Sequence, residues 1–117
     1  MSKKYQQSQI TDLILRLIDR GTPQQYHLFF QKYHEADIAD ALETFPPGTQ
    51  HAFLSKVKPD MGADVLEEME IHDQSQLILL FKTELAAKYI EEMDPDDAVD
   101  LLEELFESNE ATAEQII

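Results

Sequence analysis

The chain has 117 residues, a length that corresponds to one domain with a modest hydrophobic core. A hydrophobic content of 43% indicates a folded protein, and the absence of cysteine excludes disulfide bonds and thiolate metal sites. The longest apolar run, Leu77 to Phe81, is far too short to span a bilayer.

The formal net charge of −15 is concentrated in the second half of the chain. Residues 1–58 carry seven Lys/Arg and six Asp/Glu, which gives +1, whereas residues 59–117 carry two and eighteen, which gives −16. Such a surface repels nucleic acid and anionic membranes, so we expect neither as a partner. Cations and basic protein surfaces fit it, and the alternative is an acidic face that only maintains solubility.

The first predicted helix covers residues 8–19, and Gly21 terminates it. Its apolar side consists of Ile10, Leu13, Ile14, Leu17 and Ile18. A second helix is predicted to start at Thr22, because a Thr cap, Pro23 in the first turn and Gln25 three positions after the cap form a capping box.

A twelve-residue repeat governs the rest of the chain. Its central apolar positions are Leu42, Leu54, Leu66, Ile78, Ile90 and Leu102. Another apolar residue precedes each of these by one position, and another follows each by three. This spacing is one face of an α-helix, and twelve residues accommodate a short helix and a turn. Two units make a helical hairpin, and stacked hairpins make a solenoid.

The predicted fold is therefore all-α, a right-handed superhelix of short helices with about 12 residues per helix. Breaks are expected at Pro46-Pro47-Gly48, Lys58-Pro59-Asp60 and Asp94-Pro95-Asp96, with softer ones near Ile71 and Thr83. We expect residues 1–117 to form a single domain, divided into an N-terminal helix (1–22), the helical repeats (23–107) and the start of a further helix (108–117). Ser108 or Asn109 would cap that last helix. Because the chain stops inside it, we expect a fragment of a longer protein.

The last complete repeat carries an acidic stripe. A helix from Pro95 to Glu107, capped by Asp94, places five carboxylates opposite its core side: Asp96, Asp100, Glu103, Glu104 and Glu107. Like charges one turn apart repel by about 0.2–0.5 kcal/mol per pair, so the stripe favours a positive partner. Mg²⁺ prefers carboxylate oxygens and often uses one or two of them, which makes Asp96 and Asp100, one turn apart, candidate ligands. The alternative is that acids in a first turn only face the helix dipole.

Catalytic motifs are absent from the sequence, and we expect no enzyme activity. The four histidines, His27, His34, His51 and His72, lack the spacing of a metalloprotease site. Asp94-Pro95-Asp96 begins like a calcium-binding EF-hand loop, but Val99 replaces the required glycine and Leu105 replaces the required glutamate. The histidines are interpreted as exposed or interfacial.

Two segments resemble the cytosolic N-terminal domain of the MgtE family of magnesium transporters. They are His34 to Glu43, with the sequence HEADIADALE, and Met93 to Leu105, with the sequence MDPDDAVDLLEEL. The resemblance extends over residues 25–117. It implies a superhelical domain that is followed by CBS domains and a membrane channel in a homodimeric protein, and it places the domain at the cytoplasmic face of the membrane.

The resemblance also implies a function. In this family the cytosolic domains sense Mg²⁺, and ions between the N-terminal domain and the CBS domains hold the pore closed. By motif position, the implied Mg²⁺ ligands are Asp96 and Asp100, and the implied partners are Mg²⁺ and the CBS domains. Asp97 matches a neighbouring acidic position without an assigned role. The alternative function is a helical protein-interaction module, such as a flagellar motor switch-type domain.

Overall fold

The computed structural model describes residues 3–116, and nine helices occupy them. They are α1 (Lys3–Arg20), α2 (Pro23–Lys32), α3 (Glu35–Leu42), α4 (Pro47–Leu54), α5 (Pro59–Glu68), α6 (Ile71–Ile78), α7 (Thr83–Glu92), α8 (Pro95–Ser108) and α9 (Glu110–Ile116). The predicted all-α architecture of short helices is confirmed, including the soft breaks before Ile71 and Thr83.

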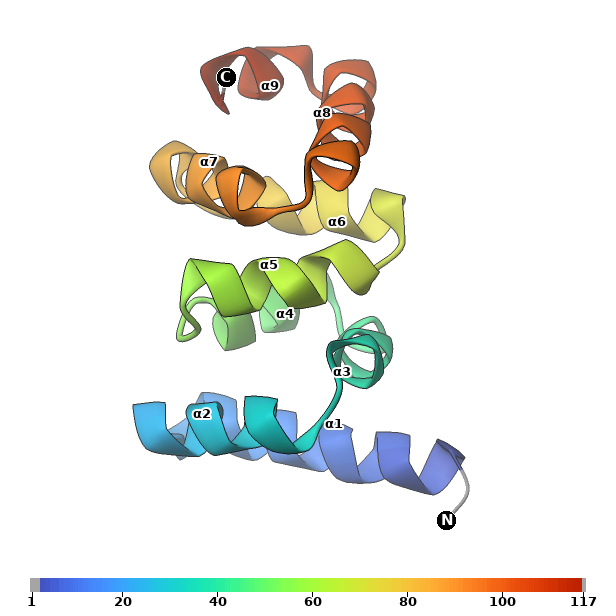
Figure 1. The fold of residues 1–117 in the computed structure, drawn as a ribbon, viewed down its shortest axis with the longest axis vertical. Coiled ribbons are helices and arrows are strands. Elements are labelled where there is room, and N and C mark those ends of the chain that lie inside the picture. The colour runs from blue at the N-terminus through green and yellow to red at the C-terminus, as the bar shows by residue number, and fades with distance from the viewer. Residues whose placement is uncertain (1–2, 117) are drawn as a thin grey trace.

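The helices stack into an elongated solenoid of 42 × 28 × 23 Å (Figure 1). Successive odd-numbered helices contact one another from α1 to α9, and α4, α6 and α8 form a second stack beside them. The helices α1 and α2 therefore lie at one end, and α8 and α9 lie at the other (Figure 1). Among the described residues, we find no helix with the length and apolar character needed to cross a membrane.

The first helix is longer than predicted, because it begins at Lys3 rather than Ser8. Its opening turns are polar and lack the apolar periodicity on which the prediction relied, but Lys and Gln are good helix formers. The last helix begins at Glu110 after Asn109, whose side-chain oxygen accepts a hydrogen bond from the Thr112 N–H at 3.3 Å. Ile117 lies outside the described residues.

Local sequence fixes several helix starts. At α2 both hydrogen bonds of the predicted Thr22–Gln25 capping box are present, at 3.0 and 3.2 Å. Proline occupies the first helical position of α2, α4, α5 and α8, where its missing N–H is not needed. At α3 the ring nitrogen Nδ1 of His34 accepts a hydrogen bond from the Ala36 N–H at 3.1 Å. This histidine is therefore a helix cap.

The repeat positions build a continuous core. All of the central repeat residues are buried or partly buried, and Leu42, Leu54, Leu66 and Ile78 are almost completely so. Tyr89 joins three helices: its ring lies against Gly62 of α5, and its hydroxyl donates to the Leu54 carbonyl at 3.2 Å. A Cβ atom at Gly62 would lie 2.6 Å from Tyr89 Cε1, so the ring needs a glycine there.

Two buried glutamines tie consecutive helices together. The amide nitrogen of Gln50 on α4 donates to the carbonyls of Leu42 and Phe45, both at 2.9 Å. Twenty-four residues later, Gln74 on α6 donates in the same way to the carbonyl of Met69 at 2.7 Å. Both glutamines thus donate to carbonyls at the end of the preceding helix, where the helical hydrogen-bond pattern stops.

Candidate functional site

The acidic stripe of α8 lies on the surface, as predicted. Asp96, Asp100, Glu103 and Glu107 are all exposed, and α8 contains no lysine or arginine that would neutralise them. Glu104 differs from the others, because it is partly buried and its Oε1 lies 3.8 Å from Nδ1 of His72 on α6. The stripe therefore presents four exposed carboxylates.

Asp96 and Asp100 occupy the first two turns of α8 and are one turn apart. Two clusters of three carboxylates occur among the described residues, and neither contains this pair. One cluster does lie at the same end of α8. It consists of Glu67 from the end of α5, Asp94 at the N-cap position of α8, and Asp97 in the first turn of α8. In this cluster, one oxygen from each carboxylate lies within 4.8 Å of the others.

The other cluster is its counterpart one hairpin earlier. It consists of Glu43, the C-cap residue of α3, with Glu70 and Asp73 at the start of α6. Each of its residues precedes the corresponding residue of the Glu67 cluster by 24 positions. The two clusters therefore arise from the same contact between helices, repeated along the solenoid.

In both clusters a glutamate from an earlier helix binds the backbone at the start of a later one. Glu67 Oε1 accepts a hydrogen bond from the Asp94 N–H at 2.6 Å, and Glu43 Oε2 accepts one from the Glu70 N–H at 3.2 Å. Asp94 occupies the predicted N-cap position of α8, but its side chain makes no capping hydrogen bond. The helix start is thus held by tertiary contacts, which bring a third carboxylate to it.

Partial burial, together with the neighbouring carboxylates, raises the pKa values of one glutamate in each cluster. Partial burial, followed by a hydrogen bond with Asp73, raises the pKa of Glu43 to about 7, although the Glu70 N–H opposes this change. Burial also raises the pKa of Glu67, and the charges of Asp94 and Asp97 add to the effect. Both glutamates are therefore poorly compensated when they are ionised.

Sequence reasoning found the exposed stripe but missed these clusters. It assigned no role to Asp97 and did not consider Glu67 as a neighbour of α8. A signal was present, because acidic residues recur 24 positions apart at all three places in the cluster. The twelve-residue repeat was interpreted only through its apolar positions.

The donor set of this face suits a hard divalent cation. Carboxylate oxygens are the preferred ligands of Mg²⁺, which retains several waters and so needs few protein ligands. Asp96 and Asp100 are exposed, so a second surface can approach them. The Glu67 cluster supplies further oxygens at the same helix end. The residues therefore fit Mg²⁺, either directly or through its bound waters.

Comparisons with known proteins place the fold. Residues 33–115 match the sequence model of a family described as the MgtE intracellular N domain. A solved structure described as "Crystal structure of the soluble part of a magnesium transporter" is similar with a TM-score of 0.78, an identity of 18% and coverage of 95% of this chain. The present chain spans 44% of that chain, less than half its length. No curated protein matches the sequence.

Proposed function

Because the chain belongs to the MgtE intracellular N domain family, we propose that it is the Mg²⁺-sensing regulatory domain of a magnesium transporter. The family resemblance inferred from residues 34–43 and 93–105 is confirmed by this match. The match favours the transporter domain over the flagellar motor switch-type alternative. The family is also one of transporter domains, which is not a class of enzymes.

In this proposal the domain works at the cytoplasmic face of the membrane and docks onto CBS domains of the same homodimeric transporter. Asp96 and Asp100 provide part of each Mg²⁺ site, and carboxylates of the CBS surface provide the rest. At low Mg²⁺ the two acidic surfaces repel each other and the domain swings free. At high Mg²⁺ the bridging ions hold the compact state in which the pore is closed.

The observation that carries the proposal is the exposed, uncompensated carboxylate face at the start of α8. The raised pKa values of Glu43 and Glu67 agree with it, because partial burial and, after it, the neighbouring carboxylates make their ionised forms unfavourable. A divalent cation relieves this repulsion, and it relieves more when a second acidic surface is brought close.

The required energy indicates several ions. To change the ratio of docked to free domain from 1:99 to 99:1, the ions must bind the docked state more tightly than the free state by about 5.5 kcal/mol. One weakly held ion supplies less than this. Asp96 and Asp100 can hold separate ions or share one, and the Glu67 cluster lies beside them. Several ions that bind together to the docked state would supply the difference.

The test is Mg²⁺-dependent protection against proteolysis in a transporter chain that carries this domain together with its CBS domains. With the native sequence, millimolar Mg²⁺ should slow cleavage between the two parts. The double variant Asp96→Asn/Asp100→Asn should lose most of this protection, because neutral amides bind Mg²⁺ weakly.

The matched control is Glu110→Gln/Glu114→Gln, which neutralises two exposed carboxylates with the same four-residue spacing on α9. This variant should keep its protection. Equal protection in all three proteins would remove Asp96 and Asp100 from the mechanism. Equal loss of protection in both variants would show that the net charge of the domain, and not these two residues, controls docking.

A further inference from the structure

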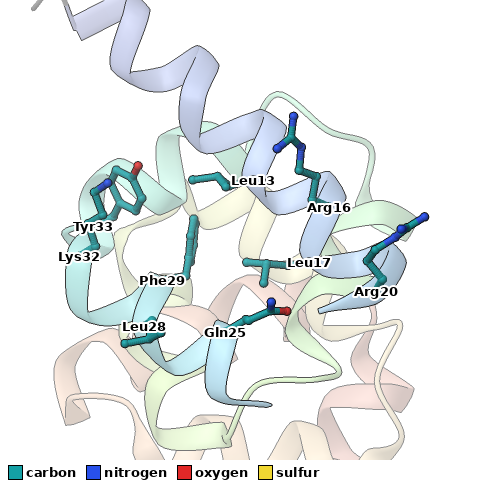
Figure 2. A pocket seen from close by; sticks show the side chains of 9 residues that line it. All are labelled: Leu13, Arg16, Leu17, Arg20, Gln25, Leu28, Phe29, Lys32 and Tyr33. Atoms are coloured by element: carbon teal, nitrogen blue, oxygen red, sulfur yellow. The ribbon is translucent and has the colours of Figure 1, made fainter. Parts of the chain in front are cut away.

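The N-terminal end of the solenoid carries an open groove between α1 and α2 (Figure 2). Its volume is about 420 Å³, and its floor is formed by Leu13 and Leu17 from α1 and by Leu28 and Phe29 from α2. Leu28 is 53% exposed, although it is a large apolar residue. The lining spans about two turns of each helix, which is the length over which one helix packs onto two others.

The rim of this groove is basic. Arg16 and Arg20 lie one turn apart on α1, and Lys32 lies across the groove on α2 (Figure 2). These three are among nine Lys/Arg in a chain whose net charge is −15. Arg20 forms an ion pair with its neighbour Asp19 that is largely solvent-exposed and therefore weak. The groove thus combines an apolar floor with cations that are available for an acidic partner.

The opposite end of the solenoid carries a surface of the complementary kind. On α8, Val99 is 52% exposed and Phe106 is 39% exposed, and Leu102 between them is only partly buried. A spacing of three and then four residues places the three on one stripe of the helix. The exposed carboxylates Glu103 and Glu107 flank this stripe at a separation of four residues. Arg16 and Arg20 have that same separation.

We propose that the α1–α2 groove receives the exposed stripe of α8 from a second copy of this chain. The apolar side chains of α8 cover the floor of the groove, and its glutamates face the arginines on the rim. Groove and stripe lie at opposite ends of the molecule, so the contact is head-to-tail and adds copies in series. The occupant is an acidic helix because the charges of the two surfaces are opposite.

The contact between groove and stripe is expected to be weak, because it buries a small area. Two turns of helix against a groove of this volume bury less than the roughly 1,200 Å² of the smallest stable interfaces. We expect a dissociation constant of about 0.1–1 mM for each contact. The weight-average mass should then remain near the 13.5 kDa of one chain at about 20 µM and at least double by about 1 mM.

Sedimentation equilibrium on two charge-reversed variants tests the proposal. The first, Arg16→Glu/Arg20→Glu, makes the groove acidic, and the second, Glu103→Lys/Glu107→Lys, makes the stripe basic. For each variant alone, the association constant should fall by at least about tenfold, because its groove and its stripe then carry charge of the same sign and repel. An equimolar mixture should associate again, because each groove then meets a stripe of opposite charge. The control Lys82→Glu/Lys88→Glu reverses two exposed lysines, at the N-cap of α7 and on α7, that belong to neither surface, and it should behave as the native chain.

A monomer at 1 mM would overturn the proposal, as would self-association of either variant at the native level. A mixture that fails to associate would do the same, because in the mixture each groove meets a stripe of opposite charge. Circular dichroism of each variant verifies its fold. Neither variant alters Asp96 or Asp100, so failure here is distinguishable from failure of the Mg²⁺ proposal.

Discussion

Replacing Glu43 with glutamine should stabilise the domain at neutral pH and leave it unchanged at acidic pH. Glutamine keeps an acceptor for the Glu70 N–H, which Glu43 Oε2 binds at 3.2 Å in the native chain. It removes a charge that lies against Asp73 and is partly buried. The substitution therefore preserves the link between α3 and α6 and removes its electrostatic cost.

The magnitude follows from the pKa of Glu43, which is raised from 4.5 to about 7. At 1.36 kcal/mol per unit, the full shift corresponds to about 3.4 kcal/mol. Because the side chain is partly exposed and water screens its charge, we expect about 1–2 kcal/mol. In a domain of this size, 1 kcal/mol shifts the midpoint of thermal unfolding by about 3–6 °C.

The sign is set by proton binding. Between pH 4.5 and about 7 the folded chain holds a proton on Glu43 that the unfolded chain has lost, so the native free energy of unfolding falls as pH rises through this window. The Glu43→Gln variant lacks this ionisable group, so its free energy of unfolding does not fall with pH for this reason. Its advantage over the native chain should therefore be full at pH 8 and vanish at pH 4.

Urea unfolding followed by circular dichroism at pH 8, 6 and 4 measures this difference. The control is Glu68→Gln, which neutralises an exposed glutamate on α5 and should change stability by less than about 0.5 kcal/mol. A Glu43→Gln variant that is less stable than the native chain at pH 8 would refute the reasoning, as would an advantage of equal size at all three pH values.

Three further substitutions test the packing of the solenoid by urea unfolding. Gln74→Leu should cost about 1–3 kcal/mol, because the Met69 carbonyl loses its buried donor, and a neutral effect would show that water replaces it. Tyr89→Phe should cost about 0.5–1.5 kcal/mol through the lost hydrogen bond to the Leu54 carbonyl, and a larger loss would indicate repacking of the ring. Leu66→Ala should cost about 2–5 kcal/mol, since this side chain is fully buried, and a loss below 1 kcal/mol would contradict its central place in the core.

Much of the fold could be predicted from the sequence because its information is local and repeated. The twelve-residue apolar period located the helices from α3 to α8, and the capping box at Thr22 and the proline at position 95 fixed two helix starts. The extension of α1 back to Lys3 was missed, since a polar helical turn has no apolar signal. The division into residues 1–22, 23–107 and 108–117 remains a prediction.

The candidate site was predictable only in part. The exposure of Asp96 and Asp100 followed from the helical periodicity of α8, whose core side was already clear. The contact between Glu67 and the start of α8 spans 27 residues and depends on how α5 and α8 lie in the solenoid. No local pattern specifies such a contact, although the recurrence of acids 24 positions apart suggests it.

The most direct test of the central claim is a Mg²⁺ titration of this chain, followed by ¹H–¹⁵N correlation spectra. The account predicts saturable, millimolar shift changes confined to Asp96, Asp100 and the neighbouring cluster of Glu67, Asp94 and Asp97, and their loss in Asp96→Asn/Asp100→Asn. Changes that are spread evenly over the acidic surface, or that persist in the double variant, would contradict it.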